Sequence, residues 1–247
     1  MTRILILGGT SEAVALAEAL HADCPELEVI TSLAGVTRNP VTGPGTLRTG
    51  GFGGADGLAD YLLAESVDGL IDATHPFASS MAAHGESAAT KIGIPRIKLV
   101  RPMWQRETGD HWIEVDDARS AAEVSKNLNP ACVLITLGRR DLEPFLALTG
   151  LRLVARMIEE PENPLPPHAT LLQARGPFSV ADEHALMEEH AVDLLVTKAA
   201  GGNATQAKIT AARERAIPVV MLRRPAMPQG PAASSVKEVM DWIADQR

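Results

Sequence analysis

The chain has 247 residues, of which 45% are hydrophobic and 22% charged, so it can build a packed globular core. Its formal net charge of −8 argues against a nucleic-acid partner, because such partners are held by a basic surface. The first apolar run, residues 4–7, is too short for a signal peptide, no run reaches membrane-helix length, and the two cysteines are far apart; we therefore expect a cytoplasmic protein without a membrane partner.

Strand-like and helix-like segments alternate along the chain, which is typical of an α/β fold with parallel sheets flanked by helices. The predicted strands span residues 3–7, 28–31, 69–72, 96–99, 132–136, 151–155, 194–197 and 219–222. The predicted helices span residues 12–20, 57–65, 79–92, 118–127, 180–189 and 204–216.

An internal similarity indicates two domains. "IPRIKLVRP" at 94–102 recurs as "IPVVMLRRP" at 217–225, and each closes a strand–helix–strand unit that starts with Val-Asp. Because the match covers a whole unit, we favour two α/β halves over a chance repeat of Ile-Pro. We expect the boundary within residues 102–110 and place it between residues 103 and 104.

The first predicted strand runs into a helix through "GGTSE", residues 8–12. Unpaired backbone N–H groups and the helix dipole at such a turn suit a phosphate, although many glycine turns hold no ligand. Laid on the dinucleotide pattern G-x-G-x-x-G/A, the turn keeps Gly8 and Ala13 but has Thr10 in place of the second glycine. Thr10 then offers its hydroxyl to a phosphate or caps the helix.

The end of the second predicted strand favours NADP. Enzymes that bind NAD usually have Asp or Glu there to hold the ribose hydroxyls, whereas this chain has Thr31 and Ser32, with Arg38 close behind. Hydroxyls and an arginine can hold a 2′-phosphate, although an ordinary polar loop would have the same residues. The following "GGFGG" at 50–54 frees the backbone to wrap a ligand, or is merely flexible.

Polar side chains follow three more predicted strands, at the ends where ligands of open α/β sheets collect. His75 in "ATHPF" could donate a proton, bind substrate or be structural. Arg139 and Arg140 follow one glycine turn, and Lys198 precedes another. Both segments suit the carboxylates or phosphates of a ligand, or form solvated charged turns.

Several well-known sites are absent from the sequence. The only tyrosine, Tyr61, is followed four residues later by Glu65, which excludes the Tyr-x-x-x-Lys pair of short-chain dehydrogenases. The sequence contains neither a P-loop nor an H-E-x-x-H motif. His184 and His190 are six residues apart and would not share a helix face, so we expect no metal site.

Taken in order, these segments resemble the precorrin-6A reductase family of cobalamin biosynthesis. The matching pieces are "ILILGGTSEAVALA", "TSLAG", "GGFGGADGLADYL", "IDATHPFA", "IPRIKLVRPMW", "GPF" at 176–178, and "VTKAAGG" with Thr205 and Lys208. The resemblance implies two Rossmann-like domains with a cleft between them: an NADP-binding domain at 1–103, and a domain at 104–247 that contributes to a site for an anionic tetrapyrrole. It also implies an NADPH-dependent reduction of one carbon–carbon double bond of precorrin-6A, which gives precorrin-6B.

The residues and the resemblance together indicate the site. The expected cofactor contacts are Gly8, Gly9, Thr10, Ser11, Glu12, Ser32, Leu33, Ala34, Gly35, Arg38, Gly51, Phe52, Gly53 and Thr74. The expected substrate contacts are Arg139, Arg140, Lys198, Gly201, Gly202, Thr205 and Lys208. The catalytic candidates are His75 and Lys198.

Two departures from the resemblance bear on the site. Similar sequences tend to have arginine where Val36 stands, so Arg38 would have to replace it, and polar residues where Ala199 and Ala200 follow Lys198. The alternatives are a cobalt-precorrin-6A reductase of the anaerobic pathway, a reductase of another anionic molecule, and a non-catalytic NADP-sensing module. We expect a monomer or a weak homodimer.

Overall fold

The computed structural model describes residues 1–35 and 40–246. The chain forms two compact units, one of Met1–Pro102 with Pro225–Arg247 and one of Met103–Arg224, and each is described by itself. Each unit contains one six-stranded sheet flanked by helices, and all paired strands within both sheets are parallel. The predicted α/β fold with two parallel, helix-flanked sheets is therefore confirmed.

In the first unit, the sheet has the order β12-β5-β4-β1-β2-β3. Its strands are β1 Arg3–Leu7, β2 Glu28–Leu33, β3 Thr46–Thr49, β4 Gly69–Asp72, β5 Arg96–Leu99 and β12 Ala232–Ala233. Its helices are α1 Ser11–Asp23, α2 Ala55–Ala64, α3 Ser79–Ile92 and α8 Val236–Asp245. Read from β3, this is the doubly wound order, with β12 in sixth place and the reversal between β1 and β4.

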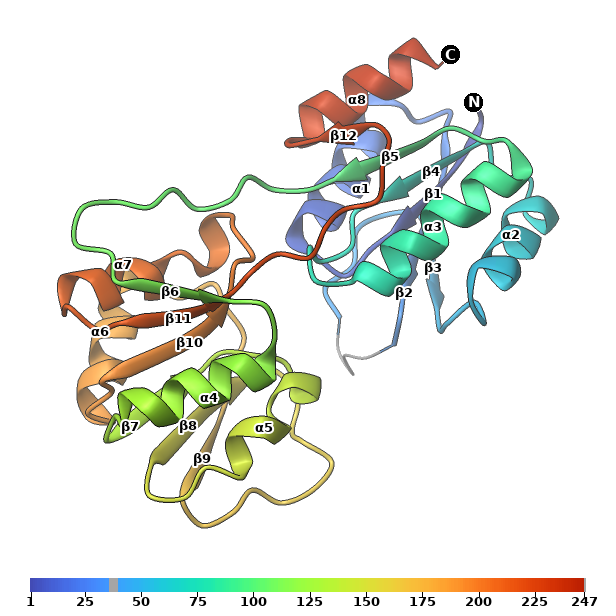
Figure 1. Cartoon of the computed structure of the whole chain (residues 1–247). Coiled ribbons are helices and arrows are strands. Elements are labelled where there is room, and N and C mark those ends of the chain that lie inside the picture. Colours follow the sequence, from blue (N-terminus) through green and yellow to red (C-terminus); the bar gives the residue numbers. More distant parts are fainter. Residues whose placement is uncertain (36–39, 247) are drawn as a thin grey trace. The chain divides into compact units, whose positions relative to one another are not determined.

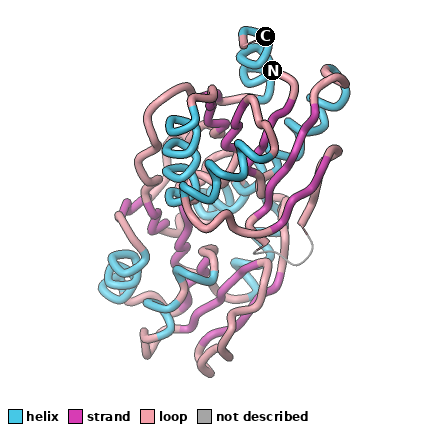
Figure 2. Tube along the Cα trace, turned by 90° about the vertical axis from the view of Figure 1, so that its right-hand side faces the viewer, coloured by secondary structure: helices cyan, strands magenta, loops and turns pink. Residues whose placement is uncertain are grey.

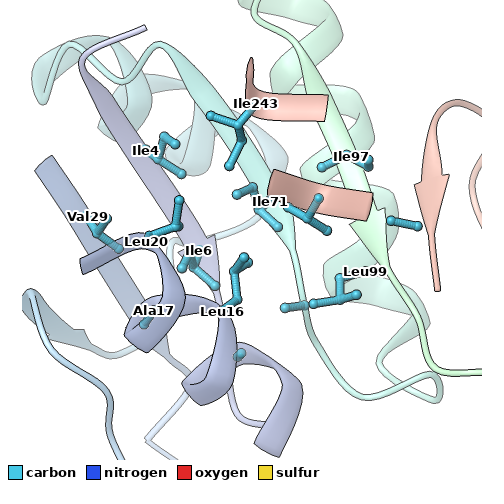
Figure 3. Packing of buried hydrophobic residues seen from close by; sticks show 14 of the residues in the cluster. Ile4, Ile6, Leu16, Ala17, Leu20, Val29, Ile71, Ile97, Leu99 and Ile243 are labelled. Carbon is cyan, nitrogen blue, oxygen red and sulfur yellow. The ribbon is translucent and has the colours of Figure 1, made fainter. Parts of the chain in front are cut away.

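Strand β1 is buried on both faces because helices cover the sheet on both sides. Successive side chains of a strand point to opposite faces. Ile4 and Ile6 accordingly pack with Leu16 of α1 and Ile243 of α8 in one apolar cluster (Figure 3). Leu5 and Leu7 pack in a second cluster that also holds Leu58 and Leu62 of α2. An unbroken apolar run of this kind is what the buried central strand of a parallel sheet needs.

In the second unit, the sheet has the order β6-β11-β10-β7-β8-β9. Its strands are β6 Trp112–Val115, β7 Cys132–Ile135, β8 Arg152–Met157, β9 Ala169–Gln173, β10 Leu194–Lys198 and β11 Val219–Leu222. Its helices are α4 Ala118–Leu128, α5 Glu143–Leu146, α6 Val180–Glu189 and α7 Ala207–Glu214, with short 3-10 turns η1 Arg139–Asp141 and η2 Asn203–Thr205. Read from β9, the order again reverses in the middle, here between β7 and β10.

The predicted boundary assigned residues 225–247 to the C-terminal domain, and the structure corrects this. Strand β12 pairs in parallel with β5, through Ala232 with Lys98 and Ala233 with Leu99 (Figure 1, where the red strand lies beside the green one). Helix α8 buries Val239 and Ile243 in the cluster of the first unit. Both views show α8 close to the start of the chain (Figures 1 and 2). A two-residue strand carries no sequence signal, so only the tertiary pairing reveals where this segment belongs.

The described residues contain no helix that is both long and apolar enough to cross a membrane.

Candidate functional site

The carboxyl ends of the first unit's strands bring four predicted segments together. The backbone N–H of Gly8 donates to the carbonyl of Ser32 at 2.9 Å, and that of Gly50 donates to the carbonyl of Leu33 at 2.9 Å. The Thr10 hydroxyl donates to the carbonyl of Ala73 at 2.7 Å. The turns after β1, β2, β3 and β4 thus meet at one edge, around the point where the strand order reverses. Ligands of doubly wound sheets bind at this place.

The turn after β1 packs against β2 at Gly8 and is open to solvent at Gly9. A Cβ on Gly8 would lie 3.0 Å from Thr31 Cγ2 and 3.2 Å from Leu33 Cδ2, so a larger residue would have to push these β2 side chains aside by a few tenths of an ångström. Gly9 has a φ of +106°, and a Cβ there would meet no atom within 4 Å. The backbone of this turn is therefore accessible to a ligand at the N-terminus of α1.

Thr10 is the N-cap of α1. Its hydroxyl oxygen accepts a hydrogen bond from the N–H of Ala13 at 3.2 Å and donates its own hydrogen to Ala73. Of the two roles predicted for Thr10, the structure shows that of a helix cap. The hydrogen bond to the Ala73 carbonyl also connects the start of α1 with the end of β4.

Glu12 in the first turn of α1 is paired with an arginine that the sequence analysis did not select. Arg101 donates to Glu12 Oε2 at 2.9 Å and to Oε1 at 3.1 Å, and Ser11 lies 3.2 Å from the same carboxylate. Burial opposes ionisation of Glu12, but Arg101, the Glu12 backbone N–H and Ser11 outweigh it and hold the pKa of Glu12 below its ordinary value. Glu12 therefore stays ionised and keeps Arg101 beside the positive end of α1.

The end of β2 carries hydroxyl and apolar residues. Ser32 is buried and accepts a hydrogen bond from Arg48 Nη1 at 3.1 Å, and Leu33 is buried too. Ala34 is exposed, and Gly35 turns the chain with a φ of +76°. Arg38, the predicted contact for a 2′-phosphate, lies outside the described residues, as does Val36.

The glycine loop at 50–54 is organised by Arg48, which sequence reasoning missed. Arg48 Nη1 donates to the carbonyl of Gly50 at 2.6 Å, and Nη2 donates to that of Gly51 at 2.8 Å. The guanidinium lies 3.7 Å from the ring centre of Phe52, which in turn meets Tyr61 edge-on at 5.2 Å. The loop is therefore a held structure rather than a merely flexible one. A basic residue two positions before the loop was the available signal.

Thr74 belongs to a buried polar cluster with Asp72 and Lys98. The Thr74 hydroxyl donates to Asp72 Oδ1 at 2.7 Å, and the Lys98 ammonium donates to the same oxygen at 2.8 Å. Lys98 also reaches the carbonyl of Thr74 at 3.2 Å and its hydroxyl at 3.0 Å. A buried charge is stable only when it is paired and hydrogen-bonded, so this cluster fixes the backbone that leads into His75.

His75 lies in the turn after β4, and its ring is held by the next residues. Its Nδ1 accepts the backbone N–H of Phe77 at 3.2 Å, and its carbonyl accepts the N–H of Ala78 at 2.8 Å. A neutral ring with an accepting Nδ1 carries its hydrogen on Nε2. In this tautomer His75 can donate a hydrogen bond from Nε2.

In the second unit, Lys198 and Asp141 face each other across the reversal of strand order. Lys198 ends β10, Asp141 ends η1 after β7, and their charged groups are 2.6 Å apart. The Lys198 side chain is 21% exposed, so the pair is accessible at the carboxyl edge of this sheet. Sequence reasoning selected Lys198 but missed Asp141, because a carboxylate on a short turn has no distinctive spacing.

The remaining predicted cations of the second unit differ in their surroundings. Arg139 and Arg140 lie on the same turn as Asp141, and Arg140 is exposed. Lys208 of α7 is only 6% exposed, and its ammonium lies 5.7 Å from the ring centre of Trp104. The Trp104 indole N–H donates to the carbonyl of Gly202 at 2.8 Å. Trp104 thus connects Lys208 with the glycine turn after β10. Gly201 and Gly202 of this turn both have positive φ, and Thr205 lies in the 3-10 turn that follows them.

A buried ion pair behind the "GPF" segment was also missed. Arg156 of β8 forms two hydrogen bonds with Glu183 of α6, at 2.8 and 3.0 Å, and both side chains are buried. The same guanidinium lies 4.1 Å from the ring centre of Phe178. Gly176 at the start of this segment lies close to the carbonyl of Ala204 on η2. The Arg156–Glu183 pair therefore supports a loop that borders the glycine turn after β10.

Comparisons with known proteins identify the family to which the chain is similar. The profile of the family described as "Precorrin-6x reductase CbiJ/CobK" matches residues 3–244. A Rhodococcus erythropolis protein described as "Precorrin-6A reductase" is 50% identical over 244 residues, which cover 99% of this chain and 97% of the relative. A Rhodobacter capsulatus protein with the same description is 41% identical over 246 residues, which cover 99% and 97%.

Two further similarities extend the comparison. A solved structure described as "CobK precorrin-6A reductase" superposes with a TM-score of 0.92 at 39% identity and covers 99% of this chain and 97% of that one. A Priestia megaterium protein described as "Cobalt-precorrin-6A reductase" is 28% identical over 256 residues, which cover 98% of both chains.

Proposed function

Because the chain belongs to the precorrin-6x reductase CbiJ/CobK family, a family of oxidoreductases, we propose that it reduces one carbon–carbon double bond of precorrin-6A to give precorrin-6B in cobalamin biosynthesis, with NADPH as the hydride donor. The observation that carries the proposal is the family match over residues 3–244. The metal-free substrate is favoured because the compared relatives named for it are 39–50% identical, whereas those named for the cobalt form are 25–28% identical.

The carboxyl edge of the first sheet fits a nicotinamide nucleotide. The turn at Gly8 and Gly9 leaves its backbone open at the N-terminus of α1, where a pyrophosphate is stabilised. No carboxylate follows β2 between Thr31 and Gly35 to hold a free ribose diol or repel a 2′-phosphate. When bound, the nucleotide supplies a hydride. Ser11, Ser32 and the glycine loop would hold it at this edge.

The chain's own groups then position the reactants and exclude water. The Asp72–Thr74–Lys98 cluster fixes the turn that carries His75, so that the Nε2 hydrogen has a defined place. Precorrin-6A carries many carboxylates, for which Lys198, Arg139 and Arg140 at the carboxyl edge of the second sheet supply cations. Lys208 would act through Trp104 on the glycine turn. We place the reaction in the cytoplasm, where reduced nicotinamide nucleotide is available.

The test is a coupled assay with purified protein, precorrin-6A and NADPH. Nucleotide oxidation and the tetrapyrrole absorption spectrum should change together with one-to-one stoichiometry. Turnover of the cobalt-bearing substrate alone would move the proposal to the anaerobic pathway. Tight NADPH binding without turnover of either substrate would instead support a nucleotide-sensing module.

A further inference from the structure

We propose that Arg48 is the residue that selects NADPH over NADH, through a direct contact between its guanidinium and the 2′-phosphate; this rests on the proposed use of a nicotinamide nucleotide. Arg48 lies beside the end of β2, where an adenosine ribose would bind. Ser32 of β2 and Arg48 of β3 are register partners in the parallel sheet, so their side chains leave the sheet on the same face. The strand end that holds the adenosine ribose in such sheets is the end of β2.

The guanidinium of Arg48 is already held in place. Its Nη1 donates to Ser32 Oγ at 3.1 Å and to the Gly50 carbonyl at 2.6 Å, and its Nη2 donates to the Gly51 carbonyl at 2.8 Å. One face of the group rests on Phe52 at 3.7 Å from the ring centre, with Tyr61 at 4.9 Å. A pre-ordered arginine loses little conformational entropy when a phosphate binds.

Arg48 also has N–H donors and positive charge available for a phosphate. A guanidinium has five N–H donors, and these three bonds engage three of them within the described part of the chain. They go to a hydroxyl and two carbonyls, which leave the positive charge uncompensated. Among the described residues, no carboxylate forms an ion pair with Arg48. The charge therefore remains available for an anionic ligand.

The glycine loop beside Arg48 is also accessible to a ligand. A Cβ on Gly50, Gly51 or Gly53 would meet no atom within 4 Å, so the loop that Arg48 holds is open on its outer side. Gly50 and Gly53 have φ values of +122° and +78°, a backbone conformation that favours glycine at both positions. A ligand phosphate can therefore approach the loop without displacing side chains.

The experiment measures binding rather than turnover. Kd values for NADPH, NADH, 2′,5′-ADP and 5′-ADP are determined for the wild type, for Arg48→Gln, and for Lys91→Gln. Lys91 is an exposed residue of α3 in the same unit, paired with Asp56, so Lys91→Gln removes the same charge from the surface. We expect Arg48→Gln to raise the Kd values of NADPH and 2′,5′-ADP by about tenfold or more. The Kd values of NADH and 5′-ADP should stay almost unchanged. Lys91→Gln should leave all four values close to wild type.

If Arg48→Gln weakened the binding of all four ligands equally, the glycine loop would have collapsed and the assignment would be overturned. An unchanged affinity of Arg48→Gln for NADPH would overturn it too. Should Arg48→Gln not fold, Arg48→Lys gives the same test, because it keeps the charge and loses the planar fork; the NADPH-to-NADH preference must still fall. A wild type that binds neither nucleotide would refute the cofactor part of the proposed function. A wild type that prefers NADPH together with an Arg48→Gln variant that keeps this preference would refute the Arg48 assignment alone.

Discussion

At the scale of single residues, Lys198 is the cation through which we expect the second unit to hold the substrate. Its ammonium lies 2.6 Å from Asp141, at the reversal of strand order and partly exposed. Asp141 orders the side chain and lowers its desolvation cost, and the ammonium carries the charge that a substrate carboxylate would bind.

Lys198→Met is therefore expected to weaken the binding of precorrin-6A by about tenfold, because a charge-assisted hydrogen bond is lost. The measurement is a titration of the tetrapyrrole absorption without nucleotide. Arg152→Gln is the matched control: Arg152 begins β8, at the opposite edge of the same sheet, and donates to the carbonyl of His190 at 2.9 Å. Equal losses in both variants would mean that only the overall charge matters.

Residue identities in this site were predictable where the backbone dictates them. Gly8 and Gly9 follow directly from a strand that must turn into a helix, and the structure gives both a steric or conformational reason. Arg48 and Lys98 escaped prediction because their roles depend on partners 16 and 26 positions away, Ser32 and Asp72. Such side-chain pairs follow from strand register, which a single sequence does not reveal.

At the scale of elements, the buried strands were predictable and the edge strands were not. Strands β1, β7, β10 and β11 have apolar runs and were expected, and so were β2, β4, β5 and β8. The edge strands β3, β6, β9 and β12 were not predicted: β3 is mostly exposed, β6 and β9 are partly exposed, and β12 has two residues. Helix α8 was not predicted, although Val236, Val239 and Ile243 repeat at helical spacing.

The placement of β12 and α8 leads to a prediction that the sequence-derived boundary would not make. Deletion of residues 225–247 should destabilise the first unit and leave the second intact, since Val239 and Ile243 are at most 1% exposed and pack on β1 and α1. Each such side chain contributes about 1.5–3 kcal/mol when buried.

Hydrogen exchange read by mass spectrometry checks this element by element. Amides of β1 should lose protection in the shortened chain, whereas those of β10 should keep theirs. Unchanged protection of β1 would show that the returning segment adds nothing to the first unit. Loss of protection in both strands would show that the two units unfold as one.

At the scale of the whole molecule, the two units repeat one plan. In each, the central strand is followed by a tight turn, and the strand order reverses beside it, so each unit presents one place for a ligand. The first has a glycine turn, hydroxyls and Arg48, which suit a nucleotide; the second has Lys198, Arg139 and Arg140, which suit carboxylates. The internal repeat at 94–102 and 217–225 fits this plan, because its copies contain β5 and β11, which occupy the same position in their sheets, next to the edge strands β12 and β6.

The central claim is that a hydride passes from the nucleotide to the tetrapyrrole on this protein. The most direct measurement is a single-turnover reaction of precorrin-6A with NADPH that carries deuterium at both C4 positions, followed by mass spectrometry of the product. We expect precorrin-6B with one deuterium on the carbon that accepts the hydride. With unlabelled NADPH in deuterated solvent, that carbon should carry none, because the solvent supplies only the proton, which goes to the other carbon of the reduced double bond. A reduced product without deuterium from the labelled nucleotide would contradict the account.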